Sequence, residues 1–499
     1  MILKITNTPK NLPPVVIVPV ASGEGLPAAI QAVASAAGMD AALITADFRA
    51  EHGEVQLLYT ASTRFFLLGM GAKPAFQDVL KAFRSFSGKY RQKLGAETGI
   101  SLLHQNLSGA AATWVEAAVN GLALGAYRIG RFKKMPDGNG HPLSAPDATL
   151  EILAEQSLAA SCEQAARRGL AIAETQMSIF DLVNAPSNKK NPSDLAQWAL
   201  ESGKKYGYQV RSLGKEQILA EGLHALLAVN RGSEYPPAFI IMEYRPETIP
   251  PAGLKKIGLV GKGVTFDTGG LSIKPSANMH YMKSDMGGAA AVFGAMEVAA
   301  KLQLPVHLIG IVPSTDNSVD AKAIKPSDVI DSYSGKAIEV IDTDAEGRLI
   351  LADGLCYMAR NYRPDTMIDL ATLTGSTVRT FGYHAAGLFS NNDELAARIY
   401  QAGERTGERN WRLPLWDAYK DDIKSDVADL RNFSGKPMAG AIGAAKFLEA
   451  FIEDHPAWAH LDIAGVAFND SEFSSQKSAT AFGVRLLVDY LSHLEGGRE

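Results

Sequence analysis

The chain has 499 residues, a length that predicts two or three domains. Of these residues 46% are hydrophobic and 21% are charged, a composition that excludes an intrinsically disordered protein. Its 49 basic and 54 acidic side chains give a net charge of −5, so nucleic acid binding is not indicated. Two cysteines cannot build a disulfide framework, which favours a reducing compartment.

The amino-terminal region, residues 1–165, alternates strand-like and helix-like segments and predicts a smaller α/β domain. Its apolar run 15–21 is bracketed by prolines and a glycine and has no convincing cleavage site. We therefore interpret it as a buried strand instead of a signal peptide, in a cytoplasmic protein. No stretch approaches the ~20 apolar residues that a membrane-spanning helix needs. Strands are predicted at 15–21, 41–48 and 64–71, and helices at 26–38 and 73–86.

A helical stretch at about 148–183 follows and ends at the turn-forming segment NAPSNKKNPSD. We interpret it as a connecting helix and place a larger carboxyl-terminal domain at 166–499. The pattern there predicts an α/β fold whose mostly parallel central sheet is flanked by helices. Strands are predicted at 238–244, 256–261, 306–314, 337–341, 366–372 and 459–468, and helices at 285–302, 348–362, 440–454 and 484–494.

Acidic side chains gather after two of these strands, where the functional groups of a parallel sheet are expected. Asp267 and Asp285 follow the strand at 256–261, and Asp344 and Glu346 follow the strand at 337–341. Carboxylates this close repel one another unless cations neutralise them. Four carboxylates balance two divalent ions, as in a two-metal hydrolase, and an oxygen-rich site favours Mn or Mg, with Zn possible.

Three basic residues lie among these acids: Lys262, Lys274 and Arg348. On charge alone they are either salt-bridge partners or groups that stabilise an oxyanion or position an anion. The loop DTDAEGR by itself is also compatible with a solvated acidic loop or a calcium site, but it lacks the spacing of an EF-hand.

The segments GKGVTFDTGGLSIKP, MKSDMGGAA and DTDAEGRLILAD resemble those that define the leucine aminopeptidases, also called cytosol aminopeptidases, a family of dinuclear metalloexopeptidases. The resemblance extends to DLVNAPSN, ATLTG, SDVADLRNFSG and HLDIAGVAF, so it covers roughly residues 180–499. It implies an enzyme that releases N-terminal amino acids from peptides by attack of a metal-bridging water.

Carried over by motif position, the resemblance implies how two metal ions are held. Lys262, as a neutral amine, and Asp285 complete the tighter site, and Asp344 completes the exchangeable one. Asp267 and Glu346 contact both ions. An amine ligand is a strong demand on Lys262, because lysine ordinarily has a pKa near ~10.4 and must lose its proton.

The same resemblance implies that Lys274 polarises the scissile carbonyl and that Arg348 holds a bicarbonate acting as general base. It also implies a homohexamer assembled through the metal-bearing domain. Small residues in the implied substrate pocket leave room for a bulky apolar side chain such as Leu or Met, although plain core packing explains the same residues equally well. The implied pocket residues are Met282, Thr372, Leu373, Gly375, Ala464 and Ala467.

Three positions depart from the family pattern without removing a proposed ligand. Asp342 stands where Asn is usual, and it either adds negative charge beside the metals or, when protonated, mimics the amide. Ser478 and Ala481 replace two usual glycines, which we expect to alter a loop near the substrate entrance. Two other interpretations stay open: a dinuclear hydrolase for another substrate, such as a Cys-Gly dipeptidase, and a non-catalytic scaffold relative.

Overall fold

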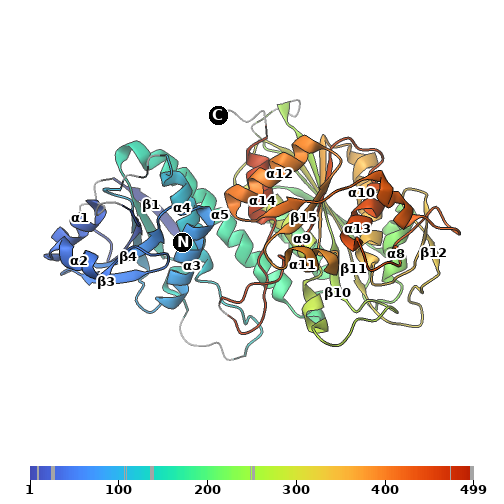
Figure 1. Cartoon of the computed structure of the whole chain (residues 1–499), viewed down its shortest axis with the longest axis horizontal. Coiled ribbons are helices and arrows are strands. Elements are labelled where there is room, and N and C mark those ends of the chain that lie inside the picture. The colour runs from blue at the N-terminus through green and yellow to red at the C-terminus, as the bar shows by residue number, and fades with distance from the viewer. Residues whose placement is uncertain are drawn as a thin grey trace. The chain divides into compact units, whose positions relative to one another are not determined.

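The computed structural model describes residues 1–7, 11–23, 28–105, 107, 109–134, 140–247, 249, 253–472 and 474–494. The chain divides into two compact units, Met1–Met177 and Ser178–Glu499, and the division falls inside helix α5 (Ala159–Asn184). Both units are mixed α/β structures (Figure 1). Among the described residues no single helix is long and apolar enough to cross a membrane. One pair, Ala28–Ala37 with Ala41–Asp47, passes that test jointly but is bent by 115°.

The amino-terminal unit contains β1 (Ile2–Thr6), β2 (Val15–Ala21), β3 (Val55–Tyr59), β4 (Arg64–Gly71), β5 (Glu97–Ser101) and β6 (Thr149–Leu153), with α1 (Ala28–Ala37), α2 (Ala41–Asp47), α3 (Phe76–Lys89) and α4 (Ala111–Leu124). The strand order is β1-β6-β5-β2-β4-β3, parallel except for β3. Alternate residues of β2 enter two different cores. Val15 and Ile17 pack with α3 and α4, whereas Val16 and Val18 pack with α1 and α2.

The predicted strand at 41–48 is wrong, because this segment is helix α2. The side chain of Asp40 accepts the N–H of Ala42 and so caps the first turn. Buried Ala41 and Ile44 are three residues apart and share one helical face.

The single helix predicted at 148–183 is also wrong in its first part. Residues 149–153 form β6, which pairs with β1 on one side and β5 on the other. Leu150 and Ile152 enter the core with the two-residue period of a strand. The helix itself begins at Ala159.

The larger unit is built on a central sheet of order β16-β15-β18-β14-β9-β11-β8-β7, with β10 paired to β11. Its middle strands β18, β14, β9 and β11 run parallel, whereas β15, β8 and β7 bring antiparallel pairings toward the edges. The strands are β7 (Gln209–Leu213), β8 (Ala238–Tyr244), β9 (Lys256–Gly261), β10 (Gly263–Asp267), β11 (His307–Asn317), β14 (Thr366–Ala371), β15 (Ala386–Ser390), β16 (Asn410–Arg412) and β18 (Trp458–Asp462).

Helices cover both faces of this sheet (Figure 1). A Cβ atom on Gly258 of β9 would meet Met358 of α10. A Cβ atom on Gly261 of the same strand would instead meet Ala289 of α9. Positions three apart on a strand face opposite ways, so α9 and α10 lie on opposite faces. The helices of this unit are α6 (Pro192–Tyr206), α7 (Lys215–Glu221), α8 (His224–Asn230), α9 (Gly287–Lys301), α10 (Glu346–Tyr362), α11 (Gly375–Phe381), α12 (Asp393–Thr406), α13 (Gly440–Glu449) and α14 (Val484–Ser492).

The strand predicted at 337–341 forms, but it is shorter and does not belong to the central sheet. It is β13 (Ala337–Glu339), which pairs with β12 (Val329–Asp331) and β17 (Leu430–Arg431) in a separate three-stranded sheet. The nearby β12 offers an antiparallel partner after a short turn, and this local pairing needs no crossover. The loop that carries Asp344 and Glu346 therefore starts from a side sheet.

Candidate metal centre

Five side chains predicted as metal ligands come together where strands end and helices begin. Lys262 directly follows β9, and Asp267 is the last residue of β10. Asp285 lies just before α9, at the end of the turn Met279–Ser284. Asp344 lies in the loop before α10, and Glu346 is the first residue of that helix.

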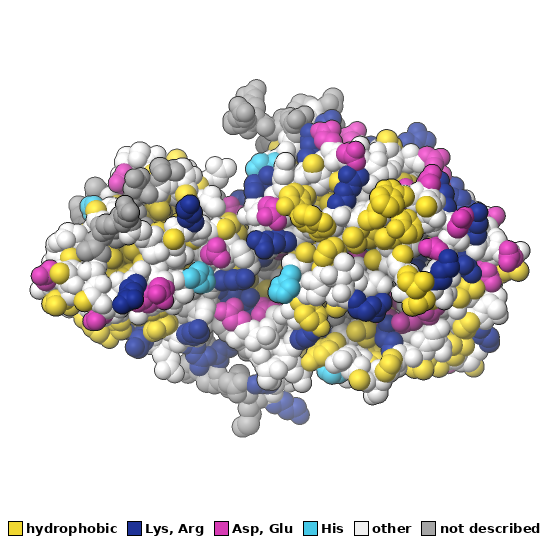
Figure 2. Space-filling view, in the orientation of Figure 1, with side chains coloured by type: hydrophobic (Ala, Val, Ile, Leu, Met, Phe, Trp, Pro, Cys, Tyr) yellow, Lys and Arg dark blue, Asp and Glu magenta, His cyan; other side chains and the backbone are white. Residues whose placement is uncertain are grey.

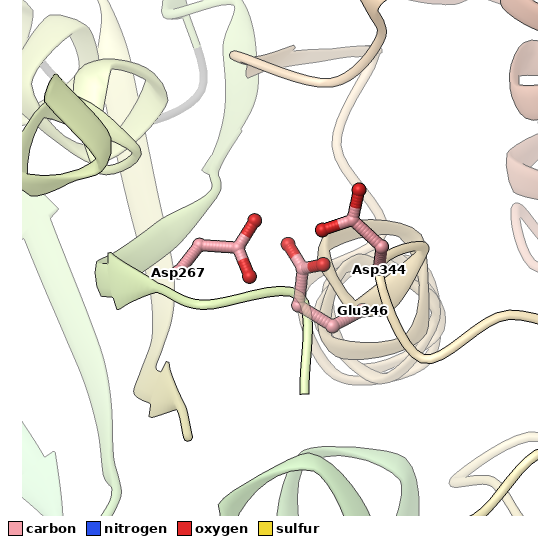
Figure 3. Close-up of side chains that lie close together, drawn as sticks. All are labelled: Asp267, Asp344 and Glu346. Atoms are coloured by element: carbon pink, nitrogen blue, oxygen red, sulfur yellow. The ribbon is translucent and has the colours of Figure 1, made fainter. Parts of the chain in front are cut away.

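Three of the carboxylates face one common space (Figure 3). One oxygen each from Asp267, Asp344 and Glu346 lies within 4.8 Å of the other two. Asp267 and Glu346 are 2% and 1% exposed, so water cannot screen the repulsion between them.

Lys262 joins this cluster to the fourth carboxylate. Its Nζ lies 2.7 Å from Oδ2 of Asp285 and 2.9 Å from Oε1 of Glu346, and it donates to the backbone oxygen of Thr372 at 3.0 Å. Helix α10 accommodates this side chain because residue 347 is glycine. A Cβ at Gly347 would lie 2.5 Å from Cε of Lys262, closer than packing allows.

Lys274 neutralises the other side of the cluster. Its Nζ lies 2.8 Å from Oδ2 of Asp267 and also forms an ion pair with Asp344. The turn that leads to Lys274 contains Gly269 and Gly270, whose φ angles of +87° and +64° favour glycine. Consecutive positive φ angles fold the chain back, so Lys274 and Asp267 can meet.

The pKa values of two acids and of both lysines in this cluster are raised above their ordinary values, for different reasons. Burial, aided by the neighbouring carboxylates, raises the pKa of Asp285 to about 8 and that of Asp344 to about 7. Burial alone lowers the pKa of Lys262, but attraction to Asp285 and Glu346 outweighs it and holds this pKa above its ordinary value. The pKa of Lys274 is raised in the same way by Asp267 and its neighbours.

This donor set fits divalent cations. Four carboxylates face two ammonium groups, so with all four acids ionised the negative charge exceeds the positive charge by two in a space that is mostly closed to water. Carboxylate oxygens are hard ligands, and a buried excess of them is stable when cations are present. Cations in this space would also favour the ionised acids and the neutral amine of Lys262.

Two family models match the sequence in chain order. The model of the cytosol aminopeptidase family, catalytic domain, matches residues 179–488, and the model of the N-terminal domain of the same family matches residues 17–136. The chain belongs to the cytosol aminopeptidase family. It is a metal-dependent exopeptidase that acts at the N-termini of peptides, so the interpretation as a non-catalytic relative is wrong.

Similar proteins match this chain over nearly its full length. The probable cytosol aminopeptidase of Chloroherpeton thalassium is 44% identical over 93% of this chain and 94% of its own length. That of Chlorobaculum parvum is 45% identical over 89% and 90%. A tomato leucine aminopeptidase variant has a TM-score of 0.86 at 29% identity, covering 99% of this chain and 96% of its own. The bottromycin maturation enzyme BotP in complex with Mn has a TM-score of 0.81 at 33% identity, covering 96% of this chain and 99% of its own.

The remaining predicted catalytic residue, Arg348, lies on the first turn of α10. Its Nη1 donates to the backbone oxygen of Asn432 at 2.7 Å, and its buried Nε has no hydrogen-bond partner among the described residues. Asp342 lies before this helix and has a bonding role that the sequence did not indicate. Its Oδ1 accepts the N–H of Asp344 at 2.8 Å and so shapes the ligand loop.

Several of the predicted pocket residues lie beside the cluster. Oγ1 of Thr372 donates to Oδ1 of Asp285 at 2.8 Å. A Cβ at Gly287, two residues beyond Asp285, would lie 2.9 Å from Cβ of Ala467 and 3.2 Å from Cγ2 of Thr372, so these side chains meet in one place. Met282, Leu373 and Ala464 are half-buried, and Gly375 is exposed at the start of α11.

Sequence reasoning missed Asn317, the last residue of β11. Its Nδ2 donates to Oδ1 of Asp267 at 2.9 Å and to the backbone oxygen of Thr343 at 3.0 Å, so it holds two ligand-bearing segments together. A partial signal was available, because Asn317 follows the strand predicted at 306–314 by three residues, at the edge where the functional groups of a parallel sheet are expected.

Proposed function

We propose that this enzyme releases bulky apolar residues, such as Leu or Met, from peptide N-termini with two divalent ions held by one lysine and four carboxylates. The observation that carries this proposal is their convergence from separate chain segments into one buried space. The proposed ligands are Lys262, Asp267, Asp285, Asp344 and Glu346.

The ligands divide between the ions according to where they lie. Lys262 and Asp285 meet on one side of the cluster, and Asp344 meets Lys274 on the other, with Asp267 and Glu346 between them. When bound, the two ions supply Lewis acidity and a water of lowered pKa near neutral pH. Mn is the first choice among Mn, Zn and Mg, since a structure of the 33%-identical BotP is described in complex with Mn.

Lys262 must give up its proton to serve as a ligand. Its Nζ contacts two carboxylates and the backbone oxygen of Thr372, so its position is set before any ion arrives. Lys274 keeps its proton and is 21% exposed at its side chain, which leaves it accessible to a substrate carbonyl. A cation at this place stabilises the negative charge that develops on the carbonyl oxygen.

Arg348 is proposed to hold a bicarbonate that accepts a proton during the reaction. Burial lowers the pKa of its guanidinium to about 10, which still leaves the group charged near neutral pH. Its buried Nε, which has no partner in the described part of the chain, is a donor that an anion would satisfy.

The pocket for the N-terminal side chain is proposed to lie between Thr372, Gly375, Ala464 and Ala467. Alanine at 464 and 467 takes little space, which favours a bulky apolar side chain over a small one. Met282 and Leu373 are proposed to add apolar surface.

A homohexamer in the cytoplasm completes the proposal. The named relatives are cytosol aminopeptidases. The catalytic unit has large apolar side chains in solvent, with Trp411, Trp416 and Met438 being 55%, 68% and 66% exposed. Figure 2 shows hydrophobic side chains gathered in groups on one face of this unit. Subunit contacts are a common reason for such exposure.

The test is a panel of aminoacyl fluorogenic substrates with Leu, Met, Ala, Gly and Glu at the N-terminus, each assayed with Mn, Zn and Mg. N-acetyl-Leu substrate and Cys-Gly dipeptide serve as controls. We expect Leu or Met to be cleaved fastest with Mn, no cleavage of the acetylated substrate, and loss of activity on exhaustive chelation. Full activity after chelation would overturn the metal assignment, and a dominant Cys-Gly activity would replace the proposed substrate class.

A further inference from the structure

A fully buried carboxylate lies beneath the substrate side of this site. Asp462 is the last residue of β18 and is 0% exposed. Its Oδ1 accepts the N–H groups of Leu373, Thr374 and Ala464 at 3.1, 3.4 and 3.2 Å. Its Oδ2 accepts the hydroxyl protons of Thr374 and Thr377, each at 2.6 Å. One side chain therefore receives five hydrogen bonds.

Four of these hydrogen bonds come from two loops at the carboxyl ends of neighbouring strands, and the fifth comes from Thr377 on the first turn of α11. Strands β14 and β18 pair in parallel, with Ala371 opposite Asp462. Leu373 and Thr374 belong to the loop after β14, and Ala464 belongs to the turn after β18. The carboxylate of Asp462 therefore connects two loops beyond the point where the backbone pairing of β14 and β18 ends.

The loop after β14 also reaches the metal centre. Oγ1 of Thr372 donates to Asp285, and the backbone oxygen of Thr372 accepts from Lys262. The loop is thus held by Asp462 on one side and by two proposed metal ligands on the other.

We propose that Asp462 is a positioning residue that sets the width of the pocket for the N-terminal side chain. It does so by fixing the loop that carries Thr372 and Leu373 against the turn that carries Ala464. This inference rests on the proposed function, because that function places the pocket between these loops. Without Asp462, three backbone N–H groups lose their buried acceptor, and the loops separate to find water.

The experiment compares kcat/KM for Leu and Ala substrates in the wild type, Asp462→Ala and Asp462→Asn, with Mn at saturation. The readout is the ratio of the two kcat/KM values within each protein. A fraction of unfolded enzyme lowers both values equally and cancels, so a merely structural role does not move this ratio. We expect Asp462→Ala to lose at least about tenfold in the preference for Leu, the scale on which a pocket distinguishes side-chain size. Asp462→Asn keeps one carbonyl oxygen for the three N–H groups, so its ratio should stay within about threefold of the wild type.

Asp369 provides a matched control on the adjacent strand. It too is a fully buried carboxylate, and it accepts from Nδ1 of His460 and Nε1 of Trp458, both on β18 and outside the two loops. Asp369→Ala should lower the thermal midpoint and leave the Leu to Ala ratio unchanged.

If Asp462→Ala does not fold, the same ratio of kcat/KM values is measured for the double variant Thr374→Val with Thr377→Val. These nearly isosteric changes remove both hydroxyl donors to Oδ2, and we expect a loss of about threefold or more in the ratio. An unchanged ratio in a folded variant, beside a wild type that prefers Leu, would overturn the role of Asp462. A wild type without preference for Leu would overturn the proposed substrate class instead.

Discussion

The Nζ atom of Lys274 lies 2.8 Å from Oδ2 of Asp267, so the side chain proposed to contact the substrate carbonyl is paired with a proposed metal ligand. Lys274 therefore has two separable effects, one on the charge of the ligand cluster and one on the reacting carbonyl. Removing its positive charge makes the cluster more negative, which does not weaken the attraction for cations.

We expect Lys274→Ala to lower kcat by ~10²–10³-fold, the usual scale for losing one group that stabilises an oxyanion. Both ions should stay bound, because no proposed ligand is removed. Metal stoichiometry measured beside kcat checks both statements. Glu346→Ala is the contrasting variant, and it should lose metal as well as at least ~10³-fold in rate, because it deletes a carboxylate between the two sites. Empty metal sites in Lys274→Ala would mean that its role is misassigned.

Asp342→Asn should retain kcat/KM within about tenfold, or ~1.4 kcal/mol in the barrier. Oδ1 of Asp342 accepts the N–H of Asp344, and the amide oxygen of Asn can accept the same bond. Asp342→Ala removes the acceptor and should cost more, because the ligand loop loses a constraint. The measurement is kcat/KM as a function of Mn concentration for all three proteins. A loss beyond a hundredfold in the Asn variant would show that the carboxylate itself is a ligand or a base.

Ala481→Gly should leave the catalytic unit as stable as before or more stable. Ala481 has a φ of +53°, in the left-handed region that costs a non-glycine residue ~1–2 kcal/mol. Ala479→Gly is the matched control, because Ala479 is also buried but is not among the residues with positive φ. It should lose about 1 kcal/mol, since glycine adds entropy to the unfolded chain. Urea denaturation of both variants checks the difference, and equal losses would contradict the strain at Ala481.

Lys190 should make stability rise with pH in the alkaline range. Its side chain is 1% exposed, and its Nζ donates to the backbone oxygens of Val183 and Lys283 at 3.1 and 2.5 Å. Burial, reinforced by Lys283, lowers its pKa from 10.5 to about 7. Between those two values the unfolded chain binds more protons than the folded chain, so the free energy of unfolding increases with pH.

The check is urea denaturation of the metal-free protein between pH 7 and pH 9.5. At each pH, the free energy of unfolding of Lys190→Met is subtracted from that of the wild type. This difference should rise by up to ~1.4 kcal/mol per pH unit. Lys189→Met removes the exposed neighbouring lysine, and the corresponding difference should stay flat. A flat difference for Lys190→Met as well would mean that this amine does not titrate in the window.

The sequence by itself picked out the acidic and basic residues that the structure brings together and predicted the strands that support them. Strands β8 and β9 form at the predicted residues because their apolar runs are buried on both faces. Such a run is recognised from its apolar composition, whichever strands it pairs with. The proposed ligands lie in two short segments, so residue type and spacing were enough to expect Asp267 and Glu346 at one metal centre.

Tertiary structure decided what depends on pairing between distant segments. A short segment such as β6 satisfies more than one backbone hydrogen-bonding pattern, and its two neighbouring strands selected between them. Helix α2 differs, because its cap at Asp40 is a local contact that the sequence analysis overlooked. The contacts of Asn317 and Asp462 join residues that are far apart in the chain. No local spacing encodes such contacts, because a buried polar side chain is placed by whichever donors and acceptors the folded sheet brings within hydrogen-bonding distance.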